Sequence, residues 1–322
     1  MNVDNRSLFA AITGEGRPLL LFTGLALFLA GAFAIFQAAT GHFLPHDEAY
    51  LGMTVETLCR YYECRVVRFM IHDRIAFGGA LSGVGVLYMW LAEFPLRHQK
   101  RWAWWAYFWS GTVGFLSFLT FLGYGYLDTW HGIATLFLLP CFALGMVRTF
   151  PQMAPAAWRS WQKRSFPLGA PIHPYQIGNA LLALTAVGLL VAGAVILIGG
   201  MTRVFVPEDL LYMQLHVADL HAINERLVPL IAHDRVAFGG ALFTTGIVMG
   251  FSVLYAERSR NLWEALLISG TFGFVGAIGV HFYVGYMNWT HLLPAYFAAT
   301  LFYVGMGLTY RQMGRGPSGD RE

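Results

Sequence analysis

Eight apolar segments, each long enough to cross a lipid bilayer, constrain this chain more than any other feature. A transmembrane helix needs about 20 predominantly apolar residues. Charged residues make up only 12% of the chain, against about 25% in soluble domains, so the chain lacks the polar side chains that cover a soluble surface. We therefore predict an all-α integral membrane protein with eight transmembrane helices, at residues 18–39, 74–94, 103–125, 132–149, 176–199, 235–255, 263–285 and 292–309.

The charged residues predict how these helices are oriented. The loops on the side of the two termini, which we call the inner side, hold 14 of the 21 Lys and Arg residues. Cytoplasmic loops carry an excess of Lys and Arg, so we expect both termini in the cytoplasm. The helical spans favour a bacterial inner membrane, because spanning proteins of the bacterial outer membrane are β-barrels. The opposite, outer side holds 11 of the 18 acidic residues and nine of the 11 histidines. No basic tract of the kind that binds nucleic acid is present.

The two halves of the chain repeat each other. Ten residues beginning at His72 recur from His233 with a single conservative change, Ile75 becoming Val236. Further matches upstream and downstream keep offsets of 159 to 162 residues. Four spans per copy is an even number, so we predict two tandem four-helix repeats in the same orientation, related by an axis along the membrane normal as parallel repeats are.

This repeat defines the expected domains. The first repeat covers residues 1–155 with an outer insert near 40–71, and the second covers 176–322 with an outer insert near 200–232. Residues 156–175, rich in proline and basic residues, form the inner linker. Apolar residues in both inserts predict short amphipathic helices lying on the outer membrane surface.

Polar residues present in both copies are the candidate functional residues, and all are expected at the outer ends of spans or in the inserts. Ionisable residues at membrane depth are costly and suggest a functional site. We expect one cluster per copy, binding a ligand from the outer side. The candidates are Asp47, His72, Asp73, Arg74, Tyr126 and His131 in the first copy, and Asp209, His233, Asp234, Arg235, Tyr286 and His291 in the second. Tyr50 and Tyr212 also match.

A purely structural interpretation accounts for each candidate singly. Asp73 and Asp234 would cap helices that start beside them, and Arg74 and Arg235 would reach lipid phosphates. The glycine pairs at 78–79 and 239–240 would allow close helix packing. His281 has no histidine partner, because its counterpart in the matching is Leu122, and packing is the interpretation favoured for it. Cys59 and Cys64 form a disulfide only if their insert faces an oxidising compartment.

Motifs exclude several enzyme classes without naming another. The chain has no HExxH or paired-cysteine zinc motif, no GxSxG hydrolase motif, and no phosphate-binding glycine loop. Arginine offers a fork of donors for phosphate or carboxylate, whereas histidine beside aspartate suits proton transfer or metal ligation. Neither pattern identifies an enzyme.

The leading hypothesis is a membrane protein that binds or transports a small anionic or lipid-derived ligand, held by Arg74 and Arg235. The first alternative is a membrane redox protein that holds haem or a metal through His72 with His131 and His233 with His291. A second alternative is an enzyme acting on lipid headgroups with His72 or His233 as base. A subunit that docks a protein partner through its outer inserts is a further hypothesis. The apolar amino-acid composition makes the lipid bilayer an expected partner of the chain.

Overall fold

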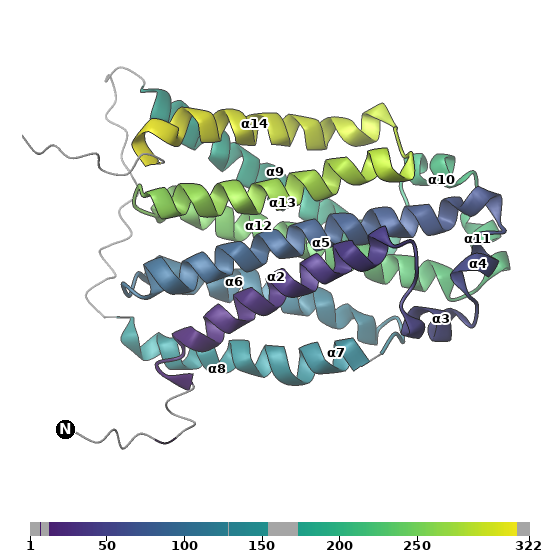
Figure 1. Ribbon diagram of the computed structural model, residues 1–322, viewed down its shortest axis with the longest axis horizontal. Coiled ribbons are helices and arrows are strands. Elements are labelled where there is room, and N and C mark those ends of the chain that lie inside the picture. The colour runs from purple at the N-terminus through teal and green to yellow at the C-terminus, as the bar shows by residue number, and fades with distance from the viewer. Residues whose placement is uncertain (1–6, 8–12, 128, 154–172, 314–322) are drawn as a thin grey trace, which may run out of the picture.

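Eight long helical segments run through the molecule in one bundle (Figure 1). The computed structural model describes residues 7, 13–127, 129–153 and 173–313. All eight segments are long and apolar enough to cross a membrane, which confirms the predicted helical membrane class. The described residues contain helices and no strand. The predicted linker at 156–175 lies outside the described residues except for residues 173–175.

The segments agree with the predicted spans in order and differ from them at their ends. In the first half they are α2 (Arg17–Ala39), α5 (Arg65–Leu91) with the π-turn η2 (Ala92–Leu96), α6 (Arg101–Phe118) with the 3₁₀ turn η3 (Leu119–Leu122), and a fourth segment of α7 (Thr129–Ile133), η4 (Ala134–Leu138), α8 (Leu139–Thr149) and η5 (Phe150–Gln152). In the second half they are α9 (Pro174–Thr202), α12 (Leu227–Tyr255), α13 (Arg260–Val284) and α14 (Trp289–Met313).

Helices α5 and α12 begin eight or nine residues earlier than the sequence predicts. They start at Arg65 and Leu227, whereas the apolar runs start at residues 74 and 235. The additional turns end in the His-Asp pairs at 72–73 and 233–234, which with the arginine after each pair interrupt the apolar residues and hide the true start of each helix. Asp73 and Asp234 therefore lie inside helices, and the expectation that they cap helix starts is wrong.

Short helices close one end of the bundle, which we call the insert end. They are α3 (Pro45–Leu51), α4 (Val55–Leu58) and the 3₁₀ turn η1 (Tyr62–Cys64) in the first insert, and α10 (Pro207–Met213) and α11 (Val217–Ile223) in the second. Figure 1 shows α3, α4, α10 and α11 together at this end, opposite the N-terminus. Their apolar residues, such as Leu58 and Leu220, are fully buried in a hydrophobic cluster of the protein itself. The inserts thus cover the bundle end with these apolar residues, and their position on the membrane surface stays a prediction.

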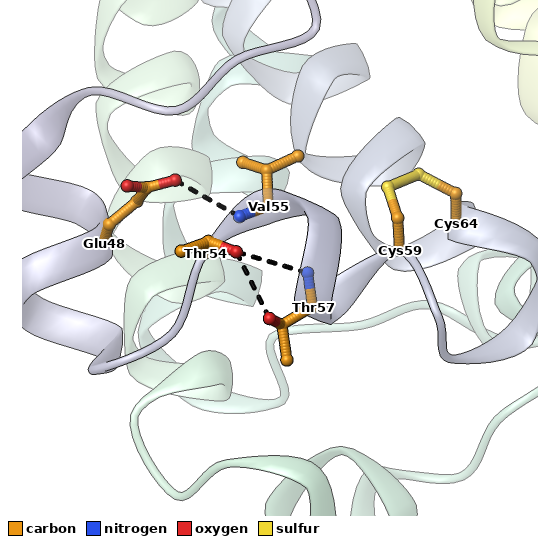
Figure 2. The surroundings of a disulfide bond; sticks show 6 residues. All are labelled: Glu48, Thr54, Val55, Thr57, Cys59 and Cys64. Atoms are coloured by element: carbon orange, nitrogen blue, oxygen red, sulfur yellow. Dashed lines mark hydrogen bonds between the residues drawn. A yellow bond between two sulfur atoms is a disulfide. The ribbon is translucent and has the colours of Figure 1, made fainter.

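A disulfide joins Cys59 to Cys64 in the first insert. Figure 2 shows it beside α4, where side chains accept hydrogen bonds from backbone N–H groups of the first turn. The hydroxyl of Thr54 accepts the backbone N–H of Thr57, and the carboxylate of Glu48 accepts the backbone N–H of Val55. Such capping satisfies N–H groups that have no partner within a helix, so these bonds fix a four-residue helix that would not form alone.

The two halves of the chain interlock through their central helices. Helix α5 packs against α2 of its own half and against α13 of the other, and α12 packs against α9 and α6 in the same manner. Close approach at glycines allows these contacts. A β-carbon at Gly79 would lie 2.7 Å from the backbone oxygen of Phe272, and one at Gly78 would lie 2.7 Å from that of Gly31. This confirms the expected packing role of the glycines, and it brings the polar residues of α5 beside α13 and α14.

Candidate functional site

Two clusters of buried polar residues lie where the long helices meet the inserts. Each cluster draws residues from both halves of the chain, whereas the sequence predicted one cluster within each copy. The first cluster consists of Asp47, Arg74, Tyr126 and His131 from the first half with His233 and Asp234 from the second. The second cluster consists of Asp209, Arg235, His281, Tyr286 and His291 from the second half with His72 and Asp73 from the first.

An arginine between two aspartates forms the frame of each cluster. Arg74 lies 2.6 Å from the carboxylate of Asp47 and 2.8 Å from that of Asp234. Arg235 lies 2.7 Å from the carboxylate of Asp209 and 3.0 Å from that of Asp73. One aspartate of each pair comes from the insert of the same half and the other from the central helix of the opposite half. The arginines are therefore bound within the protein and do not extend to lipid.

Helix geometry explains why the triplets divide between the clusters. Successive residues of an α-helix are separated by about 100° around its axis. On α5, the side chains of His72 and Asp73 reach the second cluster, while Arg74 reaches the first. The triplet at 233–235 on α12 divides in the same way. Each triplet thus supplies the histidine and one aspartate to one cluster and the arginine to the other.

Tyrosines connect the inserts to the turns between spans. The hydroxyls of Tyr126 and Tyr286 donate to Asp47 and Asp209, the second at 2.9 Å. Burial and the neighbouring carboxylate raise the pKa of each of these tyrosines, so both hydroxyls keep the proton that they donate. The other matched pair of tyrosines has a structural role, because Tyr50 and Tyr212 donate to backbone carbonyls at 2.8 Å.

Three histidines meet in the second cluster. The nitrogen atoms that His72, His281 and His291 offer all lie within 4.8 Å of one another. The Nε2 atoms of His72 and His281 are 3.1 Å apart, and the Nδ1 of His72 lies 2.9 Å from a carboxylate oxygen of Asp73. That carboxylate accepts the Nδ1–H and leaves the Nε2 lone pair of His72 pointing at the other two rings. The Nδ1 of His281 is buried and lacks a well-aligned hydrogen-bond partner.

Two histidines meet in the first cluster. The Nε2 atoms of His131 and His233 are 2.9 Å apart, and the Nδ1 of His233 lies 3.1 Å from Asp234. The rings of Phe118 and Phe121 pack on His131, with centroids 5.1 and 4.7 Å away. The histidines thus pair across the two halves of the chain. The expected pairs were His72 with His131 and His233 with His291, and no hydrogen bond among the described residues joins the ring nitrogens of either pair.

Phe121, not Leu122, is the counterpart of His281. Phe121 is 1% exposed and contacts His131, just as His281 is 4% exposed and contacts His291. Leu122 is 64% exposed, like Phe282 at 61%. The 3₁₀ turn η3 explains the shift, because it needs fewer residues per turn than the α-helix that continues through α13 in the second half. The offset changes from 159 to 160 in this turn, which explains why sequence matching paired His281 with Leu122. Matching missed His281 as a site residue because neither Phe121 nor Leu122 is a histidine.

Charge and geometry together describe what the clusters can bind. One guanidinium pairs with two carboxylates in each, so with neutral histidines each cluster carries one carboxylate more than it has guanidinium groups. Imidazole nitrogens bound to zinc lie about 2.0–2.1 Å from the metal, which places two ligands of a tetrahedral site about 3.3 Å apart. The 3.1 Å between His72 and His281 is close to that spacing. The second cluster therefore offers three metal-compatible ligands beside an excess of negative charge.

Comparison with known protein families, with curated proteins and with solved structures finds no match for this chain. The function is therefore inferred from the site itself.

The Asp47–Arg74 pair predicts a specific dependence of stability on pH. Burial raises the pKa of Asp47, but Arg74 and the Tyr126 hydroxyl outweigh burial and hold that pKa below its usual value. A depressed carboxyl pKa contributes stability that is present above the unfolded value of about 3.9 and lost as pH falls through the folded value. We expect Asp47→Asn to lower the free energy of unfolding by about 1.5–3 kcal/mol at pH 7 and by less at pH 3, below the unfolded pKa of about 3.9.

Unfolding of the detergent-purified protein, measured from pH 3 to pH 7, checks this prediction. Glu225→Gln is the matched control, because Glu225 is an exposed carboxylate of the other insert and its loss should leave stability unchanged. A constant difference between Asp47→Asn and wild type over the whole pH range would contradict the assignment.

Proposed function

We propose that the protein is a membrane metal-binding protein that holds one divalent transition-metal ion through His72, His281 and His291. The convergence of these three imidazoles in a buried site is the observation that supports the proposal. Imidazole ligands suit zinc, copper, iron and nickel. Three protein ligands leave a fourth position for water or substrate, as in sites that carry out chemistry and not in closed structural sites.

The surroundings of the histidines support ligation. A metal-bound histidine commonly donates its second ring nitrogen to a carboxylate, which fixes the ring and makes it a better ligand. Asp73 stands in this relation to His72, and Arg235 holds Asp73 in turn. Tyr286 stacks on His291 with ring centroids 4.7 Å apart. These partners order two of the three ligands before an ion arrives.

Charge favours a cation over an anion at this site. The anion-binding hypothesis needs a guanidinium with free donors, but Arg235 is engaged by Asp73, Asp209 and the backbone oxygen of Val204. Arg74 is likewise held by Asp47 and Asp234. An incoming phosphate or carboxylate would have to displace a buried carboxylate, whereas a cation neutralises the excess charge already present.

The spacing of the histidines favours a single ion over haem. Two histidines on opposite faces of a haem iron hold their nitrogens about 4 Å apart with the porphyrin between them. The nitrogens of His72 and His281 are 3.1 Å apart, and those of His131 and His233 are 2.9 Å apart. Adjacent coordination of one ion fits these distances better than ligation across a porphyrin plane.

Metal titration tests the proposed function. We expect the purified, tag-free protein to bind one Zn²⁺ per chain, measured by calorimetry and elemental analysis, and His281→Phe to lose this ion because it removes one of three ligands. His221→Phe is the matched control, since His221 is an exposed histidine of the second insert. Binding that is absent in wild type, or unchanged in His281→Phe, would refute the metal site. A Soret band in the purified protein would instead favour haem.

We also propose that the chain is a tandem duplication with both termini in the cytoplasm and the insert end outside. The repeated sequences and the excess of Lys and Arg on the side of the termini support this orientation. The Cys59–Cys64 disulfide adds support, because disulfides persist in oxidising compartments outside the cytoplasm.

Thiol labelling tests this orientation. In a Cys141→Ala background, a membrane-impermeant thiol reagent on intact cells should label Glu56→Cys in the first insert and leave Glu257→Cys, at the opposite end, unlabelled. The reverse pattern would place the inserts in the cytoplasm.

A further inference from the structure

The first cluster has the frame of the proposed metal site but one ligand fewer. Building on the proposed function, we infer that the residue at 121 or 281 decides which cluster holds metal. Phe121 keeps the first cluster from retaining an ion, and a histidine at this position would make it a second transition-metal site.

The frames of the two clusters correspond contact by contact. In each, a histidine of a central helix lies within 3.1 Å of the aspartate that follows it, and an arginine pairs with that aspartate and with an insert aspartate. In each cluster a tyrosine donates to the insert aspartate. The same tyrosine packs on a histidine of the last span of its half: the ring centroids are 5.1 Å apart for Tyr126 and His131, and 4.7 Å apart for Tyr286 and His291. Both frames have two carboxylates to one guanidinium, and among the described residues the first alone has a further histidine, His46, 3.8 Å from its insert aspartate.

The clusters differ at the position that would supply the third ligand. His281 places its Nε2 3.1 Å from that of His72. At the corresponding position, Phe121 has a ring with no hydrogen-bond donor or acceptor. His131 contacts His233 directly, with the two Nε2 atoms 2.9 Å apart. Phe121 is fully buried beside His131, so its side chain occupies the space that a third imidazole would fill.

Chemistry explains why this one difference matters. Two neutral imidazoles make a weak site for a divalent ion. A third histidine fills three of the four tetrahedral positions and leaves one for water or substrate. Histidine is smaller than phenylalanine and has a similar planar shape, and the Phe121 ring lies 4.7 Å from that of His131, so a histidine at this position would place its ring beside His131. The charge needed to favour a cation is already in place.

A substitution that adds the missing ligand tests the inference. Phe121→His should raise the amount of Zn²⁺ bound from one to two ions per chain, measured by elemental analysis after exhaustive dialysis and by calorimetric titration. Leu122→His is the matched control: it adds the same side chain one residue along, on a surface that is 64% exposed, and should leave one ion. The double variant Phe121→His with His281→Phe should hold one ion, and adding His233→Ala should release it.

The number of zinc ions bound by each variant supports or overturns the inference. One ion in both wild type and a folded Phe121→His variant would overturn this inference and leave the proposed function standing, whereas no ion in wild type would defeat the proposed function itself. Two ions in Leu122→His would show that any added histidine suffices, and would also overturn the inference. If Phe121→His fails to fold, Phe121→Cys offers a smaller ligand at the same position, and two ions in that variant support the inference while one ion contradicts it.

Discussion

The pairing of each buried arginine with two aspartates constrains the whole insert end of this protein. A guanidinium that loses one carboxylate inside a membrane protein is left partly unpaired, at a cost of about 1.5–3 kcal/mol. Because Arg74 joins Asp47 to Asp234 and Arg235 joins Asp209 to Asp73, each pairing ties an insert to the central helix of its own half and to that of the other half. Inserts, central helices and turns therefore take up their positions together.

This arrangement makes the clusters a joint product of both halves. Consecutive residues of α5 serve different clusters, so a displacement of α5 that disturbs His72 also disturbs Arg74. The excess negative charge follows directly from the frame, since two carboxylates are needed to join three elements and only one guanidinium lies between them. The two clusters differ in their histidines by one side chain, because Phe121 contacts His131 in the first where His281 contacts His291 in the second.

The sequence predicted much of this and failed at identifiable points. Long apolar runs predict spans well, because a bilayer permits few alternatives to a helix, and matching between the halves selected all twelve residues that the two frames share. The matching did not predict that each cluster combines residues of both halves, because a comparison of the two copies carries no information on how the copies pack against each other. The starts of α5 and α12 were missed because a His-Asp-Arg triplet interrupts the apolar residues of each helix. His281 was missed because its counterpart Phe121 is not a histidine, so a search for polar residues present in both copies does not select it.

X-ray absorption at the zinc edge of protein loaded with one Zn²⁺ per chain tests the central claim most directly. Three imidazole nitrogens about 2.0–2.1 Å from the metal, with the outer-shell scattering of three rings and no sulfur, are the result that this account predicts. A coordination shell dominated by carboxylate or water oxygens, with one imidazole or none, would contradict it and place the ion away from His72, His281 and His291.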